Sequence, residues 1–401
     1  MCPLYVAGLI GPGERKSLQP MAARVAPADY DQLHHFVAVG PWDEAALEAE
    51  LLAQASRLVG GPKAILVIDD TALPKKGTHS VGVGPQYAGA LGKNTNCQTL
   101  VSLTLARDEV PIPIVLRLFL PDTWIKAPER LQRAGVPEAF WAARSKPEIA
   151  LAELEHLLQA GVSFGAVVSD AGYGISASFR QGLSALGLLW AVGVPRIQKV
   201  YPPDVRLVPP PVTRGGPRKT LIPDQEAIAA EAMLAKASWR PVTWRRGTKG
   251  PLRAKFAVVR VRVADGPEVV RVRVADGPEV RLQGRTGQHL PGDEVWLVGE
   301  HRSSGERKYY LSNLPPDTPL KRLAGLIKAR WVCEQAHQQL KEELGLDHFE
   351  GRSWRGLHRH ALLTLIAYLF LQHLRLRAAK GGKKSRASAT TDLAGHPASA
   401  V

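Results

Sequence analysis

The order of apolar segments predicts an α/β fold in which three antiparallel strands precede two parallel strands reached through helices. Two observations support this prediction. Between residues 61 and 194, β-branched runs of strand length alternate with segments that have helical amphipathic spacing. The first and the fourth of these runs each end in aspartate. The chain has 401 residues, of which 45% are apolar and 22% charged, so it can form more than one core.

The composition indicates a basic protein of a reducing compartment. Lys and Arg number 52 and Asp and Glu number 37, which gives a net charge of +15 and favours nucleic acid or an anionic surface as partner. A soluble protein that happens to be basic is the alternative. The three cysteines, Cys2, Cys97 and Cys333, argue against a disulfide framework. The N-terminus lacks signal-peptide order, and the longest apolar run, residues 361–371, is too short to span a bilayer.

Residues 1–60 are expected to form a small helical module that binds DNA. The clearest helix lies within residues 41–60, where Asp43 is a candidate N-cap and Gly60 ends the pattern. The basic segment 13–24 predicts a second helix.

Residues 61–194 are expected to form the first part of the core. The runs at 64–68, 97–106 and 111–120 predict three antiparallel strands, with a turn at 107–111. A helix at 146–161, closed by Gly161, then leads to a fourth strand at 164–170.

A second helix, at 176–187, and a fifth strand, at 188–194, complete this order. The order matches the ribonuclease H-like fold, in which the ends of strands one and four lie side by side. Asp70 and Asp170 are therefore expected to be neighbours.

Residues 195–315 predict a β-rich insertion. After a Pro-rich connector, the twelve residues VVRVRVADGPEV occur at 258–269 and again at 269–280. We expect two strands joined by Asp-Gly-Pro turns. Alternation places Arg260, Arg262, Arg271 and Arg273 on one side, either as a solvated edge or as a stripe that faces DNA.

The last part of the core, residues 316–378, is predicted to be helical, and the tail 379–401 to be disordered and basic. One long helix is expected to end at Gly345, followed by a second over about 356–377. Spacings of four and seven put Arg330, Glu334 and Lys341 on one face of the long helix.

Three carboxylates are thus expected to meet: those of Asp70, Asp170 and Glu334. Such a cluster needs a cation between its members. Oxygen ligands of this kind suit Mg²⁺, which keeps its waters and takes substrate phosphate oxygens. Two ions would suit an in-line displacement at phosphorus.

Three stretches of the chain resemble one family of enzymes. IDDT, VVSDAGYG and RWVCEQAHQQLKEELGLDHFEGRSW are similar to bacterial insertion-sequence transposases of the DDE class, the cut-and-paste type with a ribonuclease H-like core. Arg330, Glu334 and Lys341 fit the Arg-x3-Glu-x6-Lys signature of this class. Ile327 stands where the signature has tyrosine, which removes one phosphate hydrogen bond.

The resemblance implies roles for individual residues. Asp70, which precedes Thr71, would be the metal ligand, and strand alternation points Asp69 to the opposite side. With Asp170 and Glu334 it would hold two Mg²⁺ ions, for which Mn²⁺ can substitute.

Several other side chains are expected to contact DNA. Arg330 and Lys341 would hold a backbone phosphate, and Lys75 with Lys76 would grip phosphates near the cut, unless these two form a solvated turn. Trp296 would stack on a displaced base, although packing is the more common role of such a residue.

The implied reaction is hydrolysis at the element's ends, followed by attack of the freed 3′-hydroxyl on target DNA. The implied partners are double-stranded DNA and a second copy of the chain, with no membrane, in the bacterial cytoplasm at the nucleoid. Two alternatives remain: a metal-dependent nuclease that does not join strands, and a DNA-binding protein that has lost catalysis. A zinc site at Cys333 and His337 is disfavoured because no second pair has suitable spacing.

Overall fold

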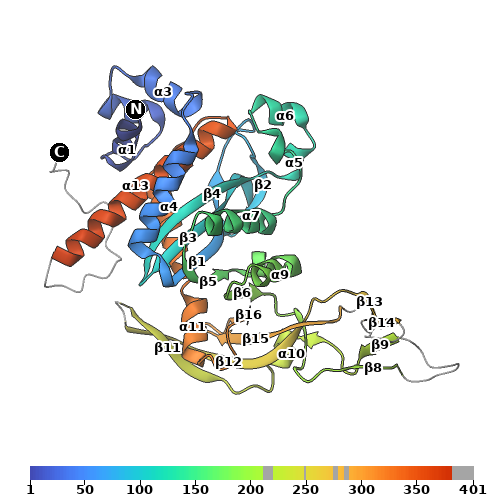
Figure 1. Cartoon of the computed structure of the whole chain (residues 1–401). Coiled ribbons are helices and arrows are strands. Elements are labelled where there is room, and N and C mark those ends of the chain that lie inside the picture. Colours follow the sequence, from blue (N-terminus) through green and yellow to red (C-terminus); the bar gives the residue numbers. More distant parts are fainter. Residues whose placement is uncertain (211–219, 248–249, 274–278, 284–288, 382–401) are drawn as a thin grey trace. The chain divides into compact units, whose positions relative to one another are not determined.

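The computed structural model describes residues 1–210, 220–247, 250–273, 279–283 and 289–381, and Figure 1 shows the course of the chain. It divides into two compact units. Unit 1 comprises Met1–Ala166 and Arg330–Val401, and unit 2 comprises Val167–Ala329. The five sequence-based segments with boundaries at 60, 194, 315 and 378 stay a prediction.

Unit 1 begins with four helices: α1 (Cys2–Ile10), α2 (Leu18–Val25), α3 (Tyr30–Ala38) and α4 (Glu44–Val59). The helices expected from the sequence are α2 and α4, and Asp43 caps α4 as predicted, accepting a hydrogen bond from the backbone N–H of Ala45. The other two were not predicted. In α1 a Cβ added at Gly8 would overlap the Met21 side chain, so this glycine permits α1 and α2 to approach closely.

The sheet of unit 1 contains β1 (Gly61–Pro74), β2 (Gly84–Ala88), β3 (Lys93–Arg107) and β4 (Val110–Phe119). β1, β3 and β4 form the predicted antiparallel meander, and the short strand β2, which was not predicted, pairs with the start of β3. The β3–β4 turn has positive φ at Asp108 (51°) and Glu109 (66°), the conformation of a two-residue hairpin turn.

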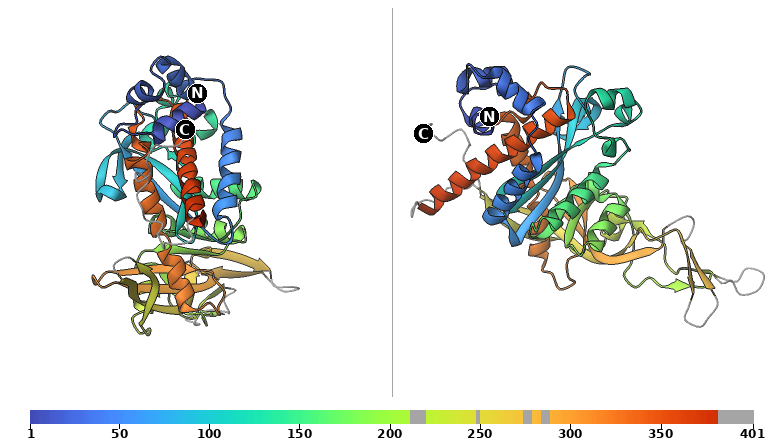
Figure 2. Two further views of the ribbon diagram at one scale, coloured as in Figure 1. Left: turned by 90° about the vertical axis from the view of Figure 1, so that its left-hand side faces the viewer. Right: turned by 45° about the horizontal axis from the view of Figure 1, so that its top comes forward.

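Helices cover both faces of this sheet. α5 (Asp122–Ile125) and α6 (Pro128–Arg133) precede α7 (Lys146–Gln159), and α12 (Trp331–Glu342) and α13 (Trp354–Gly381) close the unit. Arg117 of β4 pairs with Glu48 of α4 and Glu153 of α7, which places these two helices on one face. His337 of α12 pairs with Ser102 of β3 on the other face. Figure 2 shows α13 as a long helix of this unit.

The predicted single helix before Gly345 is wrong. The structure has α11 (Leu320–Lys328), in unit 2, and α12, in unit 1, with a turn at Ala329 and Arg330. The amide of Cys333 donates to the carbonyl of Arg330, and this i→i+3 bond begins a new helical turn. Neither a proline nor a capping side chain marks the break. The apolar spacing continues across it, and for this reason the sequence predicted one helix.

By length and composition alone, α13 could cross a membrane. Half of its most apolar window is buried in the structure. It packs against β4, α1 and α4, as expected of a core helix.

Unit 2 contains the end of β5 (Phe164–Ser169), which runs parallel to β6 (Trp190–Val194), with α8 (Ala171–Gly174) and α9 (Ala177–Ala185) between them. β6 pairs in turn with β16 (Arg307–Ser312), so the insertion extends this sheet through β15 (Pro291–His301) and β12 (Gly250–Ala264). Together with the meander of unit 1, this order of strands and helices confirms the ribonuclease H-like fold class.

The insertion is β-rich, as predicted. Its remaining elements are β7 (Lys199–Tyr201), β8 (Leu207–Val208), β9 (Thr220–Pro223), β10 (Ile228–Ala229), α10 (Ala230–Met233), β11 (Arg240–Gly247), β13 (Val269–Arg273) and β14 (Glu279–Gln283). The two copies of the repeat form strands, β12 and β13, but in different sheets, because β12 pairs with β11, β7 and β15 and β13 pairs with β14. Residues 274–278, with the second Asp-Gly-Pro turn, lie outside the described residues.

Candidate active site

The adjacent acids of β1 point to opposite faces of the sheet in unit 1. In the antiparallel register Asp69 lies opposite Ser102 and Asp70 opposite Val101. Asp69 is 9% exposed, and Asp70 is more accessible. Only one of the two acids can therefore face a given side of the sheet, and which of them binds metal stays a prediction.

Asp70 faces α7. The Nζ of Lys146, the first residue of this helix, donates a hydrogen bond to Oδ2 of Asp70 and forms an ion pair with it. The two side chains are 28% and 29% exposed, so the pair lies where solvent reaches it. Sequence reasoning missed Lys146, although its place at a helix start after two basic or polar residues was visible.

Asp69 faces α12, the helix that carries Glu334. Arg330 bridges the two acids: Nη1 binds Oδ2 of Asp69, and Nη2 lies 2.6 Å from Oε1 of Glu334. The thiol of Cys333 also donates to Oδ2 of Asp69, at 3.3 Å, and burial, followed by the charge of Asp69, raises the pKa of this thiol well above its usual value. The expected phosphate contact of Arg330 stays a prediction, since its guanidinium is here held between two carboxylates.

Glu334 is accessible, with 59% of its side chain exposed. Lys341 lies seven residues further along α12, so these two residues share one face as predicted. Between them, His337 is buried and pairs with Ser102 through Nε2 at 2.8 Å. Burial, with the charges of Lys341 and Arg330, lowers the pKa of His337 to about 3. A neutral histidine in this setting, with Cys333 bound to Asp69, supports a core role for both residues over a zinc site.

Asp170 belongs to unit 2, where it caps α8. Its Oδ1 accepts hydrogen bonds from the amides of Gly172 (2.9 Å) and Tyr173 (3.3 Å). Close packing requires glycine at position 174, because a Cβ there would overlap the carbonyl oxygen of Gly193. The meeting of Asp170 with Asp70 and Glu334 stays a prediction.

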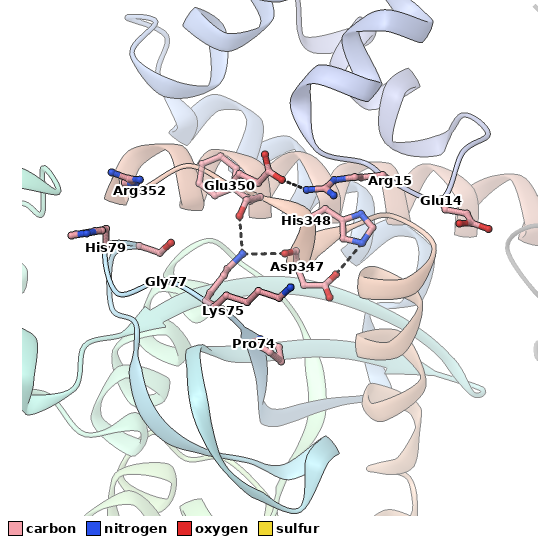
Figure 3. Close-up of a pocket in the computed structure, with 13 residues that line it drawn as sticks. Glu14, Arg15, Pro74, Lys75, Gly77, His79, Asp347, His348, Glu350 and Arg352 are labelled. Carbon is pink, nitrogen blue, oxygen red and sulfur yellow. Dashed lines mark hydrogen bonds and ion pairs between the residues drawn. The ribbon is translucent and has the colours of Figure 1, made fainter.

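Lys75 and Lys76 line an open pocket of about 500 Å³ in unit 1. Figure 3 shows the ammonium of Lys75 directed at the turn that follows α12, where it donates to the carbonyls of Asp347 (3.0 Å) and Phe349 (2.7 Å). Burial lowers the pKa of Lys75, while Asp347 and Glu350 oppose this shift. Lys75 therefore joins the end of β1 to this turn, whereas Lys76 is exposed at the rim. Phosphate binding by either lysine stays a prediction.

Trp296 of β15, in unit 2, is partly buried by its own sheet. Its Nε1 donates to the carbonyl of Pro315 at 3.0 Å, and the guanidinium of Arg260 lies 5.0 Å from the ring centroid. Arg260 also pairs with Glu294, and Arg262 donates to the carbonyl of Gly292. These contacts favour the edge interpretation of the first two arginines. Base stacking by Trp296 is untested, and the side chains of Arg271 and Arg273 lie outside those described.

Another acidic cluster in unit 1 was not visible in the sequence. Ligand atoms of Glu48, Glu153 and His156 lie within 4.8 Å of one another. Arg117 binds both glutamates, and although burial opposes its charge, Glu153 and Glu48 raise the pKa of its guanidinium. Because Arg117 already neutralises the acids, this cluster joins α4, α7 and β4 without a metal.

The carboxylates predicted to bind metal have suitable chemistry. Asp70 and Glu334 are accessible oxygen donors, and each holds a cationic side chain in this structure. Hard oxygen ligands of this kind suit a hydrated divalent ion such as Mg²⁺. Asp70, however, faces α7, and the acid of β1 that the structure brings near Glu334, through Arg330, is Asp69.

This α/β core of the ribonuclease H-like class has an aspartate within β1 (Asp70), one directly after β5 (Asp170) and a glutamate on α12 (Glu334). Comparison with known families makes this specific. The model of the DDE superfamily endonucleases matches residues 1–251, and that of the transposase DDE domain matches residues 147–370. The chain belongs to the DDE superfamily.

The chain is also similar in part to one curated protein and to two solved structures. The probable transposase for insertion sequence element IS701 of Microchaete diplosiphon is 31% identical over 188 residues, which is 47% of this chain and 46% of that protein. The matched region thus spans about half of the relative's length. Among solved structures, the piggyBac transposase synaptic complex with hairpin DNA has a TM-score of 0.42 at 11% identity, covering 96% of this chain and 67% of that one. The NurA nuclease from Sulfolobus solfataricus has a TM-score of 0.27 at 9% identity, covering 89% of this chain and 97% of that one.

Proposed function

We propose that this protein is a transposase that cleaves DNA at the ends of an insertion element and joins the freed 3′-hydroxyl to target DNA. The observation that carries the proposal is the match of two family models, over residues 1–251 and over residues 147–370. The partners proposed with it are double-stranded DNA and a second copy of the chain. The proposed location is the bacterial cytoplasm, at the nucleoid.

In this proposal the carboxylates of Asp70, Asp170 and Glu334 hold two Mg²⁺ ions, and Mn²⁺ can replace them. When bound, such ions activate the attacking oxygen and stabilise the leaving one. The protein contributes position and charge. Lys341 supplies a positive charge on the same helix face as Glu334, and Arg330 orients the Glu334 carboxylate through their ion pair.

Element ends would be sought in the DNA that flanks the gene, as short inverted repeats. A supercoiled plasmid that carries these flanks is incubated with the full chain, Mg²⁺ and a target plasmid, and the products are sequenced. Excision and joined product are expected for the wild type, and neither is expected for Asp70→Asn, Asp170→Asn or Glu334→Gln. Cleavage without joining would instead identify a nuclease, and DNA binding without cleavage a catalytically lapsed protein. Full activity of the three variants would refute the ligand assignment.

A further inference from the structure

Two open pockets of unit 1 adjoin one another. The first, of about 500 Å³, is the pocket in Figure 3, and the second has a volume of about 760 Å³. Four residues line both of them: His79, Phe349, Glu350 and Arg352. The two pockets therefore form one continuous groove, called the basic groove below. Each is in the size range of sites for small organic ligands, about 300–1,000 Å³.

The basic groove carries an excess of positive charge. Seven lysines and arginines line it, against three acids. One acid, Glu350, forms an ion pair with Arg15, and another, Asp347, interacts with the charge of Lys75. Among the described residues of unit 1, three exposed cations of the groove have no acid within ion-pair distance: Lys76, Arg133 and Arg352. These three are available to an anionic ligand.

The loop that carries Lys76 is fixed by hydrogen bonds. This loop follows β1, and Nδ2 of Asn96 donates to two of its carbonyls, those of Lys75 at 2.7 Å and Gly77 at 2.9 Å. The ammonium of Lys75 is itself bound to the turn after α12. The exposed side chain of Lys76 is thus presented from a backbone that is held on both sides.

The backbone around the two arginines is also held. The carbonyl of Arg352 accepts a hydrogen bond from the amide of Val81, in the loop after β1, at 3.2 Å. Arg133 ends α6, and the carbonyl of the next residue, Ala134, accepts from the amide of Trp354 at 2.8 Å. Fixed positions of this kind reduce the entropy that is lost when a ligand binds.

The second pocket adds exposed aromatic rings. Tyr30, the first residue of α3, is 42% exposed and lines this pocket. Its ring is stacked with that of His34, at 6.2 Å between centroids and 21° between planes. Positive charge beside accessible aromatic faces is typical of sites for single-stranded nucleic acid, in which cations follow the backbone and bases stack on the rings.

We infer that an unpaired strand of DNA lies in the basic groove, with its phosphates on Lys76, Arg133 and Arg352 and a base on the ring of Tyr30. The inference rests on the proposed function, in which DNA is the partner and cleavage exposes single strands. Duplex DNA fits the groove less well. Its phosphates can meet the cations, but its bases remain stacked inside the helix and offer no free face to Tyr30.

The first test measures binding of the full chain to a labelled oligothymidylate of about 16 nucleotides by fluorescence anisotropy, in EDTA and over a series of salt concentrations. Each phosphate contact of a single strand contributes about 0.7 to the slope of log K against log salt. Combining Lys76→Gln, Arg133→Gln and Arg352→Gln in one chain should therefore lower the slope by about two. Lys63→Gln is the matched control, because Lys63 is exposed near the opposite end of β1 and lines neither pocket.

A duplex of the same length shows which form of DNA the groove takes. The triple variant should bind it with a slope close to that of the wild type. A slope for oligothymidylate that equals that of Lys63→Gln would overturn the inference. An equal decrease for the duplex would also overturn it, because the groove would then hold double-stranded DNA.

The second test concerns the base. Tyr30→Ala should weaken binding of oligothymidylate by about five-fold to a hundred-fold and leave the salt slope unchanged, because no charge is removed. Tyr30→Phe retains the ring and should bind as the wild type does. Tyr87→Ala is the matched control, since Tyr87 of β2 is 62% exposed and lines neither pocket. Unchanged affinity of Tyr30→Ala, or an equal loss in Tyr30→Phe, would refute base stacking at this ring.

The wild type separates the inference from the proposed function. If it binds duplex DNA while the groove variants bind oligothymidylate as the controls do, the inference alone fails. If it binds neither form of DNA, the proposed function fails and the inference fails with it.

Discussion

The two adjacent acids of β1 should respond to the same substitution in opposite ways. Asp69→Asn removes the charge that binds Arg330, in a side chain that is only 12% exposed. Losing one charge-assisted hydrogen bond at such a site costs about 1.5–3 kcal/mol of unfolding free energy. For a unit of this size, each kcal/mol lowers the melting temperature by about 2–4 °C, so the expected decrease is about 3–12 °C.

Asp70→Asn should change stability much less and function much more. Its pair with Lys146 is 29% exposed on the acid side, and ion pairs of this kind contribute about 0–1 kcal/mol. Because Asp70 is a proposed ligand, however, the metal affinity of Asp70→Asn should be at least about tenfold lower than that of the wild type. Asparagine is nearly isosteric with aspartate, so packing is maintained in both variants.

Thermal melts followed by circular dichroism, together with Mn²⁺ titrations of the same samples, measure both quantities. The assignment predicts a less stable Asp69→Asn that still binds Mn²⁺, and a stable Asp70→Asn that does not. The reverse pattern would show that the metal lies on the α12 face of β1 and that Asp69 is the ligand.

Three further predictions concern the stability of the fold around the site. Desolvation lowers the pKa of His337 to about 3 and those of His358 and His360 to about 4, so below about pH 6.5 the unfolded state binds more protons than the folded state. The free energy of unfolding should therefore fall with decreasing pH, by up to about 4 kcal/mol per pH unit for the three histidines together. A urea midpoint that stays level between pH 7 and 5 would contradict this. Arg359, 1% exposed, pairs with Glu44 of α4 and donates to the carbonyls of Phe36 and Trp42, so Arg359→Met should cost about 1.5–3 kcal/mol of unfolding free energy. Arg57→Met, in an exposed pair, should cost about 0–1 kcal/mol. Equal urea midpoints for the two variants would refute this role of Arg359. Gly174→Ala should destabilise unit 2 by about 1–3 kcal/mol, because the added Cβ overlaps the backbone of Gly193. Gly325→Ala in α11 meets no neighbour and should stabilise unit 2 by up to about 1 kcal/mol through its higher helix propensity. Thermal melts that rank the two variants the other way would contradict the packing of Gly174 against Gly193.

The strands and helices of the core were predictable because local patterns determine them. Strong alternation predicted β3 and β4, a capped amphipathic stretch predicted α4 and α7, and a basic stretch predicted α2. The elements that were missed have weak local signals. β2 is five residues long and contains glycine and proline, and α1 is apolar on all sides, because it packs within the N-terminal helices and against α13.

The candidate site was predictable in its acids but not in its cations. An aspartate at the end of a buried strand stands out in a sequence. The partner of Asp70 lies 76 residues away, on a helix whose face is set only by packing. The break between α11 and α12 could not be predicted either, because arginine has a high helix propensity and gives no sign of a helix end. Arg330 is bound at this position by Asp69, which lies 261 residues away in the sequence.

The sequence by itself determined the class of fold and the family, and it predicted three candidate acids, because alternation, capping and motif spacing are local properties of the chain. Only the tertiary structure decided that Asp69 and Asp70 occupy opposite faces of β1, and that Arg330 pairs with Asp69 and Lys146 with Asp70. Ion pairs of this kind depend on the register of β1 against β3 and on where α7 and α12 pack. Those are outcomes of long-range burial that no short stretch of sequence encodes.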